Sequence, residues 1–343
     1  VKVPFDSEAW DMSNAKYSIQ DYEGKKALLL QSGFLFIKDL EFLNGTIELD
    51  INFSALRNFP GVGFRLHSPG NFEEFYIRPH QSGNPDANQY TPVFNGLAGW
   101  QLYHGEKYAT PVRYTFNEWH HLKIVVKGKQ AWIYYDDMDK PLLEVDELKH
   151  ETLAGSLGLR TFTNVHFANF EYTLDPTEYQ EGPVTTDYVD GQITLWQLSE
   201  AQDNQQFQDK LELSKADLKS INWSEHQVES SGVLNIAKHL QIAEGRSTAI
   251  AKLEIQSNTS QIKKLDIGYS DFVQVYVNGK ILYSGATNFR SRDYRYLGTI
   301  GYFDSVYLPL KKGKNEILLV VKENFGGWGI QAAMKDQQGI TIN

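Results

Sequence analysis

The sequence predicts an all-β protein built from two antiparallel β-sandwich (jelly-roll) domains in series. Along the 343-residue chain, short runs with alternating apolar residues are separated by Gly, Pro, Asn and Asp, a pattern typical of antiparallel strands joined by turns. The chain is longer than most single hydrophobic cores, which favours two domains. It contains 19 Tyr, 19 Phe and 7 Trp, and this aromatic content suits both sandwich cores and surfaces that stack sugar rings.

The first sandwich is expected over residues 1–174. Its clearest hairpin is predicted where alternating runs at 119–127 and 130–135 flank a turn at Gly128-Lys129. Further strands are expected at 27–30, 45–51, 61–65, 155–160 and 165–170. No long helix is indicated in this half, so the domain is expected to consist of β structure.

Residues 175–190 are predicted to link the two domains, because this stretch is acidic, contains two Pro and lacks apolar periodicity. The second sandwich is expected over residues 191–343. Its clearest feature is Asn278-Gly279 between two alternating runs, since both residues tolerate the positive φ of a tight hairpin. Strands are expected at 193–198, 232–236, 249–255, 272–277, 280–283, 306–310 and 315–322, and a short helix at 202–214.

Two family resemblances follow from these strands. In the first half, GTIELDI, GVGFR and FNEWHHLKIVVKGKQAWIYYDD resemble the concanavalin A-like lectin and glucanase superfamily, in particular laminin-G-like and 3-keto-disaccharide hydrolase-type domains. In the second half, DFVQVYVNGK and VYLPLKKGKNEILLVVKENFGGWG resemble the galactose-binding-like jelly roll that accompanies β-galactosidase-type glycosidases. Both resemblances imply a protein that recognises carbohydrate, and we expect a bacterial protein exported to the periplasm or the cell exterior. The shared motifs specify fold better than activity.

The charge and composition of the chain narrow the classes of partner. A formal net charge of -10 and a pI near 5.4 argue against a nucleic-acid backbone or an anionic membrane as the main partner, because either would require a basic face. No window approaches the run of about 18 apolar residues that a membrane span requires. The absence of Cys excludes disulfides, thiolate catalysis and Cys-ligated metals.

One stretch, residues 74–103 with the sequence EFYIRPHQSGNPDANQYTPVFNGLAGWQLY, gathers more polar and aromatic groups of site-forming type than any other. Strand-like runs at 75–78 and 99–103 flank it, so a long loop held on a sheet is predicted, and such loops usually carry function. A carbohydrate site would need an aromatic platform with a polar edge. The platform would be Tyr90, Trp100 and Tyr103, and the edge Arg78, His80, Asn84, Asp86 and Asn95. The alternatives are an Ω-loop that satisfies its own backbone, and a Trp100 that packs inward.

A glycoside hydrolase acting at the same loop is an alternative of a different class. His80 and Asp86 would form a base and its orienting carboxylate, while Arg78 would stabilise a developing oxyanion. A structural salt bridge between Arg78 and Asp86 explains the same residues without catalysis. A protein-binding adhesion module is the third alternative.

Two other carboxylates, Glu48 and Asp50, share one face of a predicted strand. The resemblance to laminarinase-type hydrolases implies a Glu-x-Asp-x-x-Glu strand, but the last Glu is missing from this chain. We therefore expect both carboxylates on a solvated outer face of the sheet rather than in catalysis.

The two resemblances imply one structural calcium ion, and Asn84, Asp86 and Asn88 would offer oxygen ligands at alternating positions. Zinc is not expected, because His120 and His121 are neighbours on a strand and point to opposite faces.

The run from Arg290 to Tyr296 is the one basic and aromatic segment of this acidic chain. Such a run could grip an acidic glycan or a nucleic-acid strand. Because Arg and Tyr are enriched at protein interfaces, a contact between the two domains through this run is the favoured interpretation.

Overall fold

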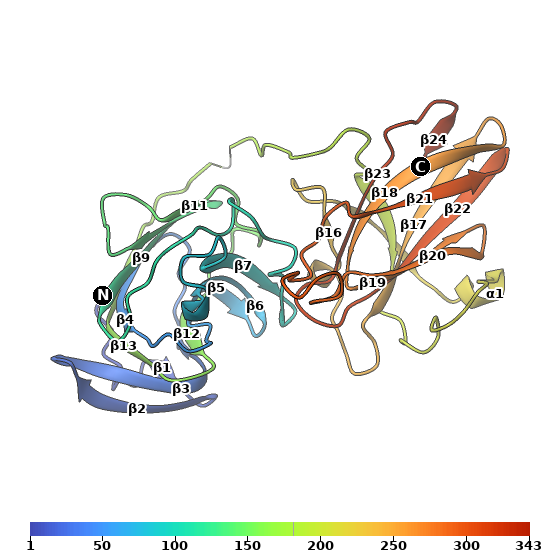
Figure 1. Cartoon of the computed structure of the whole chain (residues 1–343). Coiled ribbons are helices and arrows are strands. Elements are labelled where there is room, and N and C mark those ends of the chain that lie inside the picture. The colour runs from blue at the N-terminus through green and yellow to red at the C-terminus, as the bar shows by residue number, and fades with distance from the viewer. Residues whose placement is uncertain (181) are drawn as a thin grey trace. The chain divides into compact units, whose positions relative to one another are not determined.

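The computed structural model describes residues 1–180 and 182–343, and the regular secondary structure of these residues is almost entirely β-strand (Figure 1). The chain divides into two compact units. Unit 1 contains residues 1–96 and 103–183, and unit 2 contains residues 97–102 and 184–343. The prediction of an all-β fold with two antiparallel sandwiches is confirmed. The change of unit after residue 183 falls inside the stretch predicted to be the linker.

The strands of unit 1 are, in chain order, β1 (Trp10–Asp11), β2 (Ala15–Tyr22), β3 (Lys25–Ile37), β4 (Gly45–Asn52), β5 (Gly61–Ser68), β6 (Asn71–Ile77), β7 (Asn88–Phe94), β9 (His120–Lys127), β10 (Gln130–Tyr135), β11 (Leu143–Val145), β12 (Ser156–Thr161) and β13 (Val165–Leu174). A turn of 3₁₀ helix, η1 (Pro79–Gln81), follows β6. Neighbouring strands pair in the order β11-β10-β9-β4-β13-β3-β12-β5-β6-β7, and β1 and β2 both pair with β3.

Strand β3 joins the two layers of unit 1. Its first part pairs with β13 through residues 27–30, and its last part pairs with β12 through residues 33–36. Gly33 has a φ of 102°, and a side chain there would collide with the carbonyl oxygen of Asn14. A glycine is therefore required where the strand passes from one layer into the other.

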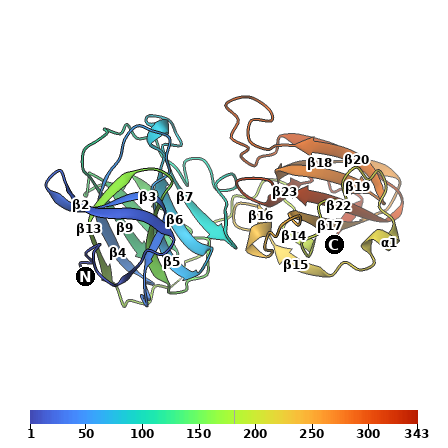
Figure 2. The same ribbon diagram turned by 90° about the horizontal axis from the view of Figure 1, so that it is seen from below.

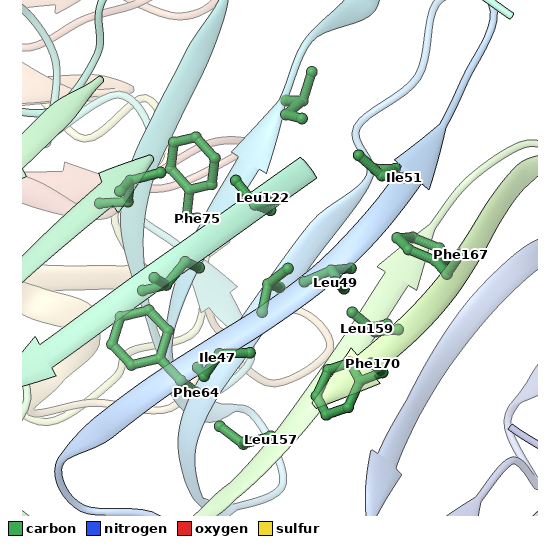
Figure 3. Packing of buried hydrophobic residues seen from close by; sticks show 14 of the residues in the cluster. Ile47, Leu49, Ile51, Phe64, Phe75, Leu122, Leu157, Leu159, Phe167 and Phe170 are labelled. Atoms are coloured by element: carbon green, nitrogen blue, oxygen red, sulfur yellow. The ribbon is translucent and has the colours of Figure 1, made fainter. Parts of the chain in front are cut away.

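The hydrophobic core of unit 1 is built from side chains of both layers (Figure 3). Along β9, buried and partly exposed positions alternate, so that Leu122 and Ile124 point inward. Phe64 of β5 and Phe75 of β6 join the same cluster from the other layer, and each is at most 1% exposed. Burying side chains of this size contributes about 1.5–3 kcal/mol each, which makes this cluster the main stabilising feature of the unit.

Strand β7 corrects the prediction of one long loop between residues 78 and 99. This strand pairs with β6 from Asn88, opposite Ile77, to Val93, opposite Phe72. Pro92 donates no backbone hydrogen bond, and the polar residues before it are typical of loops, so the sequence pattern concealed the strand. Residues 78–87 are therefore a short connection at the end of two paired strands.

Unit 2 contains β8 (Leu97–Ala98), β14 (Leu195–Ser199), α1 (Lys215–Leu218), β15 (Trp223–Gln227), β16 (Leu234–Asn235), η2 (Ile236–Lys238), β17 (Thr248–Ser257), β18 (Gln261–Ser270), β19 (Phe272–Val277), β20 (Lys280–Ala286), β21 (Asp304–Leu310), β22 (Gly313–Lys322), β23 (Gly329–Ala333) and β24 (Ile340–Ile342). One sheet has the order β15-β14-β17-β22-β19-β20, with β24 also pairing with β17, and the other has the order β16-β23-β18-β21. Figure 2 labels the strands of both sheets except β21 and β24. Among the described residues, no helix is long and apolar enough to cross a membrane.

Both predicted tight hairpins are present. In unit 1, Lys127 and Gln130 pair across a turn in which Gly128 has a φ of 55°. In unit 2, β19 and β20 are joined by Asn278 and Gly279, whose φ angles are 51° and 82°. These left-handed angles match the twist of the flanking strands, so the local sequence alone was enough to place both turns.

The short helix predicted at residues 202–214 is not formed. The helix is instead α1, where Ser214 and Asp217 form a capping box that starts it at Lys215. Phe207 and Leu213, in the predicted helical segment, are buried in a small cluster on one face of the sheet. The packing of these two side chains, rather than helical hydrogen bonds, therefore fixes the conformation of this segment.

Candidate functional site

The residues that best fit a functional site lie on the outward face of β12, β5, β6 and β7 in unit 1, and we call this surface the β6 face. On β6, Phe75 and Ile77 enter the core, so the alternate residues Glu74 and Tyr76 point outward. The β6 face consists of Gly61, Gly63, Glu74, Tyr76, Arg78, Gln89 and Arg160, with a rim of Arg57, Phe59, His80 and Phe162.

A buried ion pair crosses the β6 face. Arg160 binds Glu74 through two nitrogens, with Nη2 2.7 Å from Oε2 and Nε on Oε1. The Glu74 side chain is completely buried, whereas that of Arg160 is 18% exposed. The pair lies over Gly61, where a Cβ atom would come within 2.6 Å of Glu74 Oε1. A glycine on β5 thus makes room for the ion pair, and the bidentate geometry fixes the guanidinium plane.

Beside this pair, a second guanidinium is held by three partners. Nη2 of Arg78 donates to Tyr76 Oη at 2.6 Å and to Gln89 Oε1, and Nη1 donates to the carbonyl of Asp86 at 3.0 Å. The Tyr76 hydroxyl donates to Gln89 Oε1 at 2.8 Å. Burial raises the pKa of Tyr76, so its hydroxyl stays neutral at neutral pH. The arrangement gives the floor of the face a rigid set of hydrogen-bonding groups.

Aromatic side chains form the rim of the β6 face. The Phe59 ring lies 5.9 Å from that of Phe162 and 5.2 Å from that of His80. Asn58 positions the two phenylalanines, because its Oδ1 accepts the backbone N–H of Phe59 at 2.8 Å and of Phe162 at 3.1 Å. Phe162 is 64% exposed. An exposed aromatic ring held in place by a buried amide is suited to contact a ligand.

His80 and Asp86 do not form the base and orienter predicted for an enzyme. Nδ1 of His80 is buried and has no hydrogen-bond partner in the part of the chain that the structure describes. Burial lowers the pKa of His80, and the charges of Arg57 and Arg78 lower it further, so the imidazole is neutral at pH 7. The Asp86 carboxylate instead faces Arg78 Nη1 at 3.9 Å, as the structural alternative predicted.

Two of the three aromatic residues predicted as a sugar platform, Tyr90 and Tyr103, are buried, which corrects that expectation. Tyr90 pairs with Phe75 on the core side of the sheet, is 0% exposed, and donates its hydroxyl to Glu73 Oε2 at 2.7 Å. Tyr103 is 1% exposed. Neither tyrosine therefore offers a ring on the β6 face, and Trp100 belongs to unit 2.

Trp100 packs within unit 2, where its ring centroid lies 5.5 Å from that of Phe325 and 6.5 Å from that of Phe289. Changing Trp100→Ala is expected to lower the free energy of unfolding by about 2 kcal/mol, less than for a fully buried ring, because the side chain is half-buried. Glycan binding should stay unchanged. Chemical denaturation and a glycan-binding assay of the same variant check these two expectations. A loss of binding at unchanged stability would show that Trp100 contacts the glycan.

The remaining predicted polar residues are dispersed. Asn84 is exposed and donates to Gln81 Oε1 at 2.5 Å. Asn95 is at the turn after β7 and has a φ of 50°, and its backbone N–H donates a hydrogen bond to Asn71 Oδ1 at 3.0 Å. Its conformation is that of a turn residue.

The residues suggested for calcium do not fit a calcium site. Both ends of the Asn88 amide are used, because Nδ2 donates to the carbonyl of Thr110 at 2.9 Å and Oδ1 accepts its N–H at 3.3 Å. Asp86 faces Arg78, and Asn84 is turned to solvent. Calcium requires six to eight converging oxygens, and no group of three or more His, Cys, Asp or Glu that could hold a metal occurs among the described residues.

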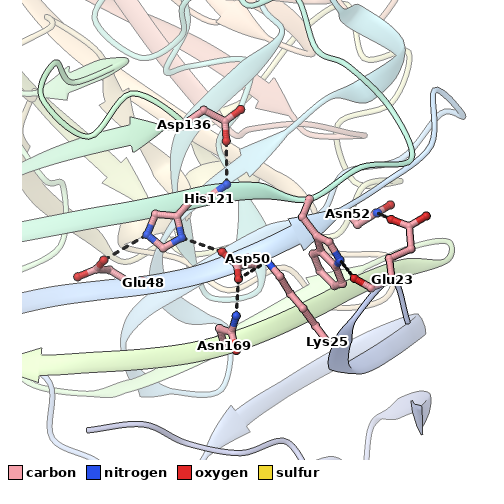
Figure 4. A network of polar contacts seen from close by, with 9 residues as sticks. Glu23, Lys25, Glu48, Asp50, Asn52, His121, Asp136 and Asn169 are labelled. Carbon is pink, nitrogen blue, oxygen red and sulfur yellow. Dashed lines mark hydrogen bonds and ion pairs between the residues drawn. The ribbon is translucent and has the colours of Figure 1, made fainter. Parts of the chain in front are cut away.

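On the other layer of unit 1, a separate polar network surrounds His121 (Figure 4). Its Nδ1 lies 2.8 Å from Asp50 Oδ1 and its Nε2 3.2 Å from Glu48 Oε2, while Lys25 Nζ lies 2.7 Å from Asp50 Oδ2. Glu48 and Asp50 are on the outer face, as predicted, but Asp50 is only 8% exposed. Burial opposes charge on His121, but its hydrogen bonds to both carboxylates outweigh this and raise its pKa. The carboxylates are thus engaged in a structural network.

His120 points away from His121, as predicted for strand neighbours. It is 4% exposed, and its Nδ1 lies 2.8 Å from Asp136 Oδ2. Asp136 also accepts the backbone N–H of His121 at 2.8 Å through its other oxygen. One carboxylate therefore ties the side chain of His120 to the backbone of its neighbour, and the two imidazoles do not converge on a metal site.

The basic run in unit 2 is partly neutralised within that unit. Arg292 forms an ion pair with Asp304, and Nε of Arg295 lies 3.0 Å from Asp293 Oδ1. The guanidinium of Arg290 lies over the Phe289 ring at 4.9 Å. A contact between the domains through this run stays a prediction.

No protein-family model and no curated protein sequence matches this chain. Solved structures match about half of this chain. The carbohydrate binding module CBM66 from Bacillus subtilis is 18% identical over 49% of this chain and 96% of its own, with a TM-score of 0.38. A protein of unknown function with a galectin-like fold from Bacillus subtilis is 10% identical over 50% and 94%, with a TM-score of 0.37. The Bacillus licheniformis β-glucanase is 10% identical over 51% and 97%, with a TM-score of 0.35.

Proposed function

We propose that this protein binds carbohydrate at the β6 face of unit 1. The observation that carries the proposal is the exposed ring of Phe162 directly beside the Arg160 guanidinium, with the guanidinium carbon 5.2 Å from the ring centroid. Sugars present an apolar C–H face and a ring of hydroxyls, so they are bound by an aromatic surface next to fixed donors and acceptors. The β6 face offers this combination.

The Arg160 guanidinium provides a donor that is already oriented, and the nearly buried Arg78 guanidinium supports the floor beside it. Arg160 uses Nε and Nη2 on Glu74, which leaves Nη1 directed away from the carboxylate and available to a hydroxyl oxygen. Arg78 is held by Tyr76, Gln89 and Asp86, so its plane is fixed before a ligand arrives. Groups that need no reordering lose little conformational entropy on binding. This supports recognition of paired hydroxyls on a glycan.

Hydrolysis is supported less well than binding. A glycosidase needs two carboxyl groups across the scissile bond, one of which must be free to donate a proton. The two carboxylates near the β6 face are Glu74, bound by Arg160, and Asp86, facing Arg78. We therefore propose a binding protein, with export from a bacterial cell as a further prediction and a protein-binding adhesion module as the competing function.

Phe162→Ala tests the proposal. Removing the ring is expected to weaken binding of a glycan identified by array screening about tenfold or more, a loss of about 1.4 kcal/mol. Stability should change by less than about 0.5 kcal/mol, since the ring is 64% exposed. Isothermal titration calorimetry on the full chain provides the measurement.

Tyr17→Ala is the matched control, because Tyr17 is another exposed ring, 44% exposed, on β2 of the same unit. Its binding constant should equal that of the unchanged protein. If Phe162→Ala binds the glycan as well as Tyr17→Ala does, the β6 face is not the glycan site. The competing function, a protein-binding adhesion module, would then be favoured.

A further inference from the structure

A groove of about 490 Å³ lies entirely within unit 2. Its floor is one face of the sheet at β22, β19 and β20, and residues 204–209 form one wall. A volume in this range is ordinary for small-molecule sites and accommodates about one or two sugar rings. The groove shares no residue with the β6 face.

Two rows of cross-strand neighbours form the floor of this groove. The rows are Ala286–Phe272–Lys322 and Ser284–Gln274–Val320. Opposed side chains in such rows lie about 5 Å apart, so the Phe272 ring has the small Ala286 on one side and the Lys322 side chain on the other. Phe272 and Gln274 are half-buried. The floor therefore presents an aromatic ring beside an amide and an ammonium group.

The wall is anchored before any ligand binds. Phe207 is 1% exposed and belongs to the cluster that packs on the sheet. Asn204 Oδ1 accepts a hydrogen bond from Thr248 Oγ1 at 2.9 Å. These contacts hold the exposed residues Gln208 and Asp209 at the edge of the groove, which limits the entropy lost on binding.

Five polar side chains that line the groove form no side-chain hydrogen bond or ion pair with the rest of the described chain. They are Gln208, Asp209, Gln274, Ser284 and Lys322. The two amides both donate and accept, the carboxylate accepts, and the ammonium donates. A sugar has hydroxyls that do both, and an apolar face that packs on an aromatic ring. No ligand with a single strong charge is favoured, because the groove carries one cation and one anion.

We propose that this groove is a second carbohydrate site, which takes one or two neutral hexose units. Phe272 packs against the C–H face of the sugar, and Gln274, Lys322 and Asp209 bind its hydroxyls. The site shares no residue with the β6 face, so a single chain has two separate carbohydrate sites.

The test is a titration of the full chain with four probes: methyl β-D-glucopyranoside, methyl β-D-galactopyranoside, cellobiose and lactose. Saturation-transfer NMR and calorimetry are expected to detect at least one of them. Ala286→Trp, which fills the groove from the exposed edge strand β20, should abolish that binding, and Gln274→Ala should weaken it about tenfold.

Thr341→Trp is the matched control, since Thr341 is exposed on β24, which pairs with the other end of β17 at residues 255–257. Binding that survives Thr341→Trp and Phe162→Ala but not Ala286→Trp supports the proposal. The proposal is overturned if none of the four probes binds, or if Ala286→Trp binds them as strongly as the unchanged protein does. Binding lost only in Phe162→Ala would overturn it while supporting the β6 face.

Discussion

Arg160→Ala is expected to lower the free energy of unfolding by about 3 kcal/mol and to abolish glycan binding at the β6 face. The loss of stability arises because Glu74, whose side chain is completely buried, would lose the cationic partner that offsets the cost of its burial. Glu74 would also lose two charge-assisted hydrogen bonds. Chemical denaturation measures the first effect, and calorimetric titration with the array-selected glycan measures the second.

A double variant separates the structural role of Arg160 from its role in binding. Replacing both partners with apolar side chains of similar volume, Glu74→Leu with Arg160→Met, removes the buried charge along with its partner. Most of the stability should return, since such replacements are often neutral or stabilising. Glycan binding should remain absent because the guanidinium is gone. A double variant that regains binding would show that Arg160 only supports the fold.

Glu323 is expected to make the stability of unit 2 fall as the pH rises from about 5 to about 8. Burial raises its pKa from 4.5 to about 8, and the Asp271 carboxylate contributes in the same direction. Glu323 is 3% exposed, and its Oε2 has no hydrogen-bond partner among the described residues. The folded state therefore holds this proton more tightly than the unfolded state does.

The direction and size of the effect follow from proton linkage. Below about pH 4.5 both states are protonated at Glu323, and between the two pKa values only the unfolded state releases the proton. The free energy of unfolding should thus fall by an amount on the order of 5 kcal/mol, at about 1.4 kcal/mol per pKa unit, and level off above pH 8. Denaturation at a series of pH values measures this.

Glu323→Gln provides the comparison, because an amide has the shape of the protonated acid and does not titrate in this range. The variant should show a flatter pH dependence and should exceed the unchanged protein in stability at pH 8. An identical pH dependence in both proteins would mean that Glu323 ionises normally in the folded state.

The fold was predictable from the sequence where local rules were sufficient. The turns at Gly128 and Asn278-Gly279 need positive φ angles that few residues adopt, so the flanking hairpins followed directly. Strand β7 was missed because Pro92 and its polar neighbours are atypical of a paired strand. The segment at 202–214 was misread because tertiary burial of Phe207, not helical propensity, decides its conformation.

The candidate site was predictable only in part, because its residues are far apart in sequence. Arg78, His80 and Asp86 could be selected from one polar stretch, but Phe59, Phe162 and Arg160 are brought to it by strand pairing. One signal was present in the sequence. The spacing Glu74-x-Tyr76-x-Arg78 puts three polar residues on one face of a strand, opposite the spacing Gly61-x-Gly63 on its neighbour.

The groove in unit 2 had no signal of this kind. Its wall, residues 204–209, reaches the sheet through the packing of a single buried phenylalanine. Its floor combines rows from three strands, of which β22 lies far from β19 and β20 along the chain. Neither feature is periodic in the sequence, so only the folded structure reveals the site.

A glycan array probed in parallel with the full chain and with its Phe162→Ala variant tests the central claim most directly. The account predicts that the unchanged protein retains a defined set of glycans and that the variant loses them, while Tyr17→Ala retains them all. If no glycan is retained, or if Phe162→Ala gives the same pattern as the unchanged protein, carbohydrate binding at the β6 face is contradicted.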